Sequence, residues 1–191
     1  MFCRRDGVIL LFGRKANIFK KNKYFRDGEF LVVCGVFCVF SIFADQFIKY
    51  LIVNNLLLQE SVVVINNIFK LTYVKNYGAA FSILLNQTLF LILSTLSIMF
   101  GFVFYIFKKN VKDRVYIFSI SMIVAGGLGN LLDRLFRGFV VDYINLCFWP
   151  FYMFAVFNFA DCLVVVGSFL FMFRFVKNEF FKKNVRKIKR L

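Results

Sequence analysis

The chain has 191 residues, of which 61% are apolar, 20% aromatic and only 18% charged, so it is more apolar than soluble domains are. This composition indicates an integral membrane protein of one small domain, and the long uncharged runs exclude a transmembrane β-barrel, whose strands alternate polar and apolar residues. The formal charge of +15 does not indicate nucleic-acid binding, because the basic residues lie in blocks beside apolar runs.

The sequence contains no histidine. The usual zinc ligand and the usual general base are therefore missing, which disfavours most metal sites and serine–histidine catalysis. Carboxylates remain the main groups for proton transfer. The five cysteines, at positions 3, 34, 38, 147 and 162, form no Cys-x-x-Cys pair, and we interpret them as small apolar side chains.

Residues 1–28 form a basic arm, with eight Lys or Arg up to Arg26, and we expect it to be cytoplasmic. The first membrane span follows at about Phe30–Val53. Within this span Asp45 and Lys49 are four residues apart, which places them on one helix face where they can pair. The pair is either a salt bridge that reaches the outer interface or an element that orients a site.

The segment between the first two spans, Asn54–Gln87, is mixed in composition. Its stretches Ser61–Asn66 and Phe69–Val74 are β-branched and partly alternating, which predicts short strands outside the membrane core. Next comes Asn76-Tyr-Gly-Ala-Ala-Phe-Ser82, in which an amide precedes small residues. This pattern permits a tight turn and the close approach of a ligand to the backbone, although a turn leading into the next span explains it equally well.

We expect the second and third spans at Thr88–Phe107 and Val115–Leu132. The third span ends in Gly126-Gly-Leu-Gly-Asn-Leu-Leu-Asp-Arg134, where glycines allow helices to pack closely. Asn130 and Arg134 share one helix face. An ordinary packed helix with an interfacial ion pair between Asp133 and Arg134 explains most of this pattern, but not the buried amide.

The run Tyr143–Ala160 is uncharged over 18 residues and could itself cross the membrane. If only about Phe157–Val176 crosses, there are four spans, both termini are cytoplasmic, and 20 of the 25 basic residues lie on that side. Five spans would leave 12 of 25 there. The positive-inside rule favours four spans, and Pro150, Trp149 and Tyr152 favour a segment lying at the outer interface.

Two acids, Asp142 and Asp161, flank that segment, and four spans place both on the outer side. Carboxylates near apolar spans are costly to ionise and usually serve a function. Asp161 could also act as a helix N-cap, for which Asn158 is the better candidate, and Asp142 could be a solvated loop acid. If the two carboxylates meet, one holds a proton near neutral pH while the other accepts one, and the pair titrates as a unit.

Five motifs occur in order along the chain: Asp45-x-x-x-Lys49, Asn76-x-Gly-Ala-Ala-Phe81, Gly126-Gly-x-Gly-Asn130-x-x-Asp-Arg134, Gly138-x-Val-Val-Asp142 and Phe157-Asn-x-Ala-Asp161. Together they resemble bacterial lipoprotein signal peptidase, also called signal peptidase II, over about Leu31–Val176. Cys162 departs from the family, in which Ser or Thr is common at that position.

The resemblance implies an aspartyl endopeptidase of the bacterial inner membrane, with its site near the outer face. It implies removal of signal peptides from diacylglyceryl-modified prolipoproteins by cleavage before the lipidated cysteine, without a metal or other cofactor and as a monomer among membrane lipids. Asp142 and Asp161 match the family's catalytic pair. Seven further residues match positions that bind substrate or support the site: Asp45, Lys49, Asn76, Gly78, Asn130, Arg134 and Asn158.

We therefore predict an all-α membrane bundle of four transmembrane helices, with a small extracytoplasmic β-rich segment between the first and second helices. The domain division is a basic cytoplasmic arm at 1–28, a peptidase domain at 29–176 and a basic cytoplasmic tail at 177–191. A GxGD-type intramembrane protease fits less well, because Asn130 stands where that motif requires Asp. The other alternative is a non-catalytic transporter or lipid-binding bundle in which the acids are ligands.

Overall fold

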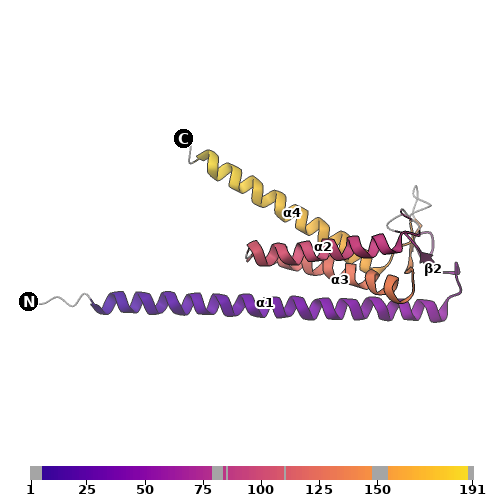
Figure 1. Cartoon of the computed structure of the whole chain (residues 1–191), viewed down its shortest axis with the longest axis horizontal. Helices are drawn as coiled ribbons and strands as arrows, with labels where there is room; N and C mark the ends of the chain where they lie inside the picture. Colours follow the sequence, from indigo (N-terminus) through magenta and orange to yellow (C-terminus); the bar gives the residue numbers. More distant parts are fainter. Residues whose placement is uncertain (1–5, 79–83, 85, 110, 148–154, 189–191) are drawn as a thin grey trace, which may run out of the picture.

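The computed structural model describes residues 6–78, 84, 86–109, 111–147 and 155–188. Four helices pack beside one another, with a small sheet at one end, and the start of α1 and the end of α4 lie at the opposite end (Figure 1). The elements follow in the order α1 (Asp6–Asn55), β1 (Ser61–Ile65), β2 (Phe69–Asn76), α2 (Thr88–Lys109), α3 (Arg114–Phe136), β3 (Val140–Leu146) and α4 (Phe159–Ile188).

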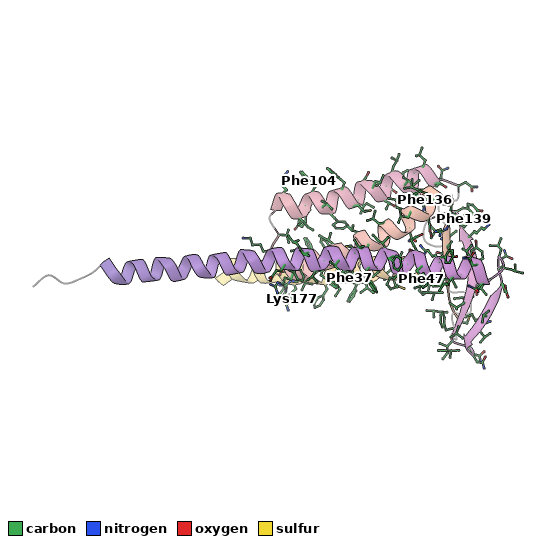
Figure 2. The ribbon with its side chains drawn as sticks, turned by 90° about the horizontal axis from the view of Figure 1, so that it is seen from below. Phe37, Phe47, Phe104, Phe136, Phe139 and Lys177 are labelled. Carbon is green, nitrogen blue, oxygen red and sulfur yellow. The ribbon has the colours of Figure 1, made fainter. Side chains whose placement is uncertain are left out.

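Each helix contains a stretch that is long and apolar enough to cross a membrane. These stretches are Gly28–Asn55, Thr88–Ile106, Arg114–Phe136 and Phe159–Asn178, and their bounds differ from the predicted spans by at most four residues. The prediction of four apolar helices is confirmed. Phe47 of α1 and Phe104 of α2 lie on the outer surface of the bundle (Figure 2), where apolar side chains can face lipid.

The uncharged run Tyr143–Ala160 is not a continuous helix, because it begins in β3 and α4 starts only at Phe159. Trp149, Pro150 and Tyr152, on which the interfacial interpretation depended, lie outside the described residues.

The helices α1 and α4 run without a break through residues 28 and 176. The helical structure therefore marks no boundary at either place, and the division into arm, domain and tail stays a prediction.

Helix α3 is the centre of the bundle. Of its most apolar stretch 61% is buried, against 17% or less for the other three helices. Met122 and Ala125 of α3 form a buried cluster with Leu163 of α4. At the end of the bundle opposite the sheet, Asp113 caps α3 and pairs with Arg174 of α4 at 2.6 Å.

Small residues let α3 and α4 approach closely, as the glycine pattern predicts. A Cβ added to Gly126 would overlap the carbonyl oxygen of Ala160. A Cβ added to Gly167 would lie 2.8 Å from the carbonyl oxygen of Ser119. No real Cβ can occupy either place, so the backbones of the two helices are in direct contact.

The three strands form one antiparallel sheet in the order β1-β2-β3, beside the last turns of α1 (Figure 2). Strands β1 and β2 match the two predicted strands. Strand β3 was missed, so the sheet is not confined to the segment between α1 and α2. Strand β3 contains the β-branched residues Val140, Val141 and Ile144, which favour a strand, but its second half, from Tyr143, lies in the uncharged run that we interpreted as an interfacial segment.

The turn from α3 into β3 depends on Gly138, whose φ is +79°. This left-handed conformation follows the end of α3 at Arg137 and is favourable for glycine because glycine has no Cβ. It sends the chain back along the sheet, where Val74 of β2 lies opposite Asp142. Tyr73, Val141 and Tyr143 then pack with Ile52 of α1 in a second buried cluster.

The contact between α3 and α4 gives a test of the fold. Gly126→Ala should destabilise the protein by about 1–3 kcal/mol, because the new methyl group overlaps the backbone of Ala160. Gly127→Ala is the matched control: its Cβ would meet Met99 Sδ at 3.4 Å, an ordinary contact, and alanine favours the helix. Thermal unfolding in detergent measures both. Equal stabilities would contradict the close backbone packing.

Candidate active site

The first turn of α4 is held by a reciprocal pair of hydrogen bonds between Asn158 and Asp161. The backbone N–H of Asp161 donates to Asn158 Oδ1 at 2.9 Å, and the backbone N–H of Asn158 donates to Asp161 Oδ2 at 3.1 Å. This is a capping box, with Asn158 as the cap and Asp161 as the third helical residue. The preference for Asn158 as the cap is confirmed. The other carboxylate oxygen of Asp161, Oδ1, accepts from a different residue.

That partner is Asn130 of α3, whose Nδ2 donates to Asp161 Oδ1 at 2.7 Å. Asn130 Oδ1 in turn accepts from Lys49 Nζ at 3.0 Å and from Asn158 Nδ2 at 3.1 Å. The buried amide that an ordinary packed helix did not explain therefore connects α1, α3 and the start of α4.

Asp142 is held from two sides. Asn158 Nδ2 donates to its Oδ1 at 2.7 Å, and Asn76 Nδ2 donates to its Oδ2 at 2.9 Å. Asn76 stands at the end of β2, and its own Oδ1 accepts from the backbone N–H of Gly78 at 2.9 Å. Asp142 is buried, so it is not a solvated loop acid.

Asp142 and Asp161 face the same cavity, which has a volume of about 550 Å³. Arg134 also lines it and donates through Nη2 to the carbonyl oxygen of Gly78 at 2.9 Å. The remaining walls are mostly apolar and come from β3, the segment before α4, and α4 itself: Val140, Leu146, Ala155, Val156, Phe157, Val164, Val165 and Val166. An apolar cavity with a few converging polar groups is typical of a ligand site.

The surroundings of Asp142 favour its neutral form. Burial and the nearby charge of Asp161 raise the pKa of Asp142 from 3.8 to about 7, although the hydrogen bonds from Asn76 and Asn158 oppose the shift. In the described part of the chain, neither acid forms an ion pair with a lysine or arginine. Two acids held by amides can share one proton near neutral pH.

A buried ionic cluster lies directly behind the two acids. Lys49 Nζ lies 2.8 Å from Asp45 Oδ2 and 2.9 Å from Asp133 Oδ2, and all three side chains are at most 1% exposed. The partly exposed Arg137 pairs with Asp133 as well. The cluster holds two acids and two bases, so it carries no net charge and each buried charge has a partner.

This cluster decides between interpretations that the sequence left open. The pair of Asp45 and Lys49 forms as predicted and is buried, so it is not an exposed salt bridge. Asp133 and Arg134 form no ion pair with each other: Asp133 faces Lys49 and Arg137, whereas Arg134 donates to the backbone of Gly78. Neighbouring residues on a helix point in different directions, which separates the two.

Sequence reasoning did not include Asp133, Gln46 and Arg137 among the site residues. Gln46 Nε2 donates to Asp133 Oδ1 at 3.2 Å and to the carbonyl oxygen of Gly129 at 3.0 Å, and its Oε1 accepts from Arg137 at 2.9 Å. The spacing of four residues between Asp133 and Arg137 was a usable signal. No local pattern linked Gln46 to them, because it lies 87 residues from Asp133.

The structure brings all nine predicted site residues to the end of the bundle where the sheet lies. Ala79, Ala80, Phe81 and Ser82 of the second motif lie outside the described residues. Cys162 lines the cavity beside Asp161, and Cys147 and Cys162 are both free thiols.

The sequence matches the family of signal peptidase (SPase) II over residues 37–177. It is 42% identical over 135 residues to the lipoprotein signal peptidase of Caldanaerobacter subterraneus subsp. tengcongensis, covering 71% of this chain and 90% of that protein. It is 38% identical over 146 residues to the lipoprotein signal peptidase of Haemophilus influenzae, covering 74% and 83% respectively.

A solved structure described as a bacterial membrane enzyme, determined by the in meso method at 2.3 Å, is similar in fold. The TM-score is 0.73 with 31% identity, over 77% of this chain and 89% of that one. Fold and similarity together define the class of this protein as a membrane-spanning protease. The chain belongs to the signal peptidase II family, which weighs against a non-catalytic transporter or lipid-binding bundle.

The buried cluster gives a test of stability. Lys49→Met should lower the free energy of unfolding by about 3–5 kcal/mol, because Asp45 and Asp133 then lose the ammonium that they share. Lys177→Met, which removes an exposed lysine, is the matched control and should change it by less than about 0.5 kcal/mol. Denaturation in detergent micelles measures the difference; similar values for the two variants would mean that the cluster is not a stabilising unit.

Proposed function

We propose that this chain is an aspartic endopeptidase that removes signal peptides from diacylglyceryl-modified prolipoproteins, cutting before the lipidated cysteine. Family membership supports the protease and its substrate class. The observation that carries the aspartic mechanism is that Asp142 and Asp161 line one cavity and are both held by amide N–H groups. Such an environment keeps a pair of acids available for proton transfer.

In the proposed reaction the ionised acid removes a proton from a water molecule, and the resulting hydroxide attacks the scissile carbonyl. The protonated acid polarises that carbonyl and then donates its proton to the leaving amine, so the pair holds one proton before and after the cycle. The burial that raises the pKa of Asp142 to about 7 suits it to hold this proton. The reaction needs no covalent intermediate.

The other predicted residues then have separate tasks. Asn76 and Asn158 orient Asp142, and Asn130 orients Asp161. Arg134 fixes the turn at Gly78 beside the cavity, where exposed backbone can align the substrate strand. The apolar wall formed by Val164, Val165 and Val166 suits the apolar signal helix or the acyl chains, which position the cleavage point.

We further propose that the protein acts as a monomer in the bacterial inner membrane, with both termini in the cytoplasm and the cavity near the outer face. Two observations support this orientation: 20 of 25 basic residues fall on one side of four spans, and the first turns of α1 and the last turns of α4 lie at the end away from the sheet (Figure 1).

Substitution of Asp142 and of Asp161 tests the mechanism. Asp142→Asn and Asp161→Asn should each lower cleavage of a diacylglyceryl-modified prolipoprotein by about 10³-fold or more, because an amide can neither take nor give the proton. Binding of the substrate should persist. Asp113→Asn is the matched control, since Asp113 lies at the opposite end of α3. Mass spectrometry of the products measures cleavage, and a double variant that still cuts would contradict the mechanism.

The pH dependence of cleavage tests the protonation state. Below pH 7 Asp142 holds its proton, and above pH 7 it loses it, so kcat/KM should fall about tenfold per pH unit above an apparent pKa near 7. A second decrease should appear at low pH, where the pair gains a second proton. A profile that is flat between about pH 6 and 9 would contradict the shared proton.

A further inference from the structure

The backbone immediately before each of the two acids is held by another acid. The N–H of Ala160, one residue before Asp161, donates to Asp45 Oδ1 at 3.1 Å. The N–H of Val141, one residue before Asp142, donates to Asp133 Oδ2 at 3.1 Å. Asp45 belongs to α1 and Asp133 to α3. These two helices therefore hold the backbone that positions Asp142 and Asp161.

One ammonium group joins these two holding acids. Lys49 Nζ contacts Asp45 Oδ2 at 2.8 Å and Asp133 Oδ2 at 2.9 Å, and its third donor reaches Asn130 Oδ1 at 3.0 Å. Asn130 also holds Asp161 directly. The donors of Lys49 are therefore all occupied, and the cluster has a defined geometry rather than a loose ion pair.

Each oxygen of the Asp133 carboxylate accepts two hydrogen bonds. Oδ2 accepts from Lys49 Nζ and from the N–H of Val141, and Oδ1 accepts from Gln46 and Arg137. An asparagine at this position would place an NH₂ group against donors on one side or the other. The substitution therefore breaks contacts although it preserves the shape of the side chain.

We propose that Asp133 is a positioning residue for the reaction, which together with Asp45 and Lys49 forms a brace that sets the separation of Asp142 and Asp161. The proposal rests on the function proposed above, because it assumes that these two acids act as a pair. Asp133 does not face the substrate: it acts through the N–H of Val141 and through the shared Lys49.

The separation of the two acids matters because the charge of Asp161 adds to the effect of burial, which is the larger cause of the raised pKa of Asp142. Repulsion between charges falls as the distance between them grows. If the backbone at Val141 shifts so that Asp142 lies farther from Asp161, Asp142 loses its proton at lower pH. A misplacement of about 1 Å also lowers the rate by about 10²-fold, because water and carbonyl are then poorly aligned.

The test compares Asp133→Asn with Asp113→Asn in full-length protein purified in detergent. Both substitutions remove a paired acid at an end of α3, but Asp113 caps the other end of the helix and pairs with Arg174. For Asp133→Asn we expect kcat to fall by about 10- to 100-fold with KM changed by less than about threefold, and the upper apparent pKa of kcat/KM to move down. Asp113→Asn should keep both the parental kcat and the parental profile.

A second variant separates positioning from folding. Asp133→Asn with Arg137→Gln removes one acid and one base, so the cluster stays neutral and the Lys49–Asp45 pair is kept. The proposal expects this double variant to recover thermal stability while kcat stays low. Recovery of kcat together with stability, or no recovery of stability at all, would overturn the proposal, because Asp133 would then serve the fold alone.

Asp142→Asn assayed in parallel distinguishes the two proposals. If Asp142→Asn abolishes cleavage while Asp133→Asn keeps the parental kcat and pH profile, the brace is wrong and the proposed function stands. If Asp142→Asn still cuts, the proposed mechanism itself fails, and the brace fails with it.

Discussion

The buried ammonium of Lys49 is the interaction on which the rest of the site depends. It is fully enclosed and lies between carboxylates of α1 and α3. A charge in that position is costly unless each donor finds an acceptor, and removal of one partner leaves the others unpaired. The helices α1 and α3 can therefore pack against each other in few other registers. Gly129 of α3 leaves the space that the Asp45 carboxylate occupies, because a Cβ there would lie 2.7 Å from Asp45 Oδ2.

The acids that line the cavity have partners of a different kind from those of the buried cluster. Asp45 and Asp133 are neutralised by basic partners, whereas Asp142 and Asp161 receive amide donors from Asn76, Asn130 and Asn158. Amides fix the orientation of a carboxylate without supplying the charge that would hold it ionised. The two pairs of acids are linked through the backbone: Asp45 and Asp133 accept from the N–H groups of Ala160 and Val141, each one residue before Asp161 and Asp142.

Much of this could be predicted from sequence because the signals were local. Hydropathy located the apolar runs and the distribution of basic residues favoured four spans over five. Asn158 was the better candidate for the cap of the last helix, and the pairing of Asp45 with Lys49 followed from a separation of four residues. Strand β3 was hidden because its second half, from Tyr143, lies in an uncharged run that was interpreted as a segment at the membrane interface. The role of Asp133 was hidden because its partners Lys49, Gln46 and Val141 meet it only after the chain has folded.

The proposed mechanism requires that Asp142 and Asp161 hold one proton between them below the pKa of Asp142, which is about 7. Difference infrared spectroscopy of the parent against Asp142→Asn, across a pH titration, measures it directly by separating protonated from ionised carboxyl groups. The mechanism predicts one protonated carboxyl at about pH 6 that Asp142→Asn removes and that disappears in the parent as the pH rises above 7. Two ionised carboxylates at about pH 6, with no difference between parent and variant in the protonated region, would contradict it.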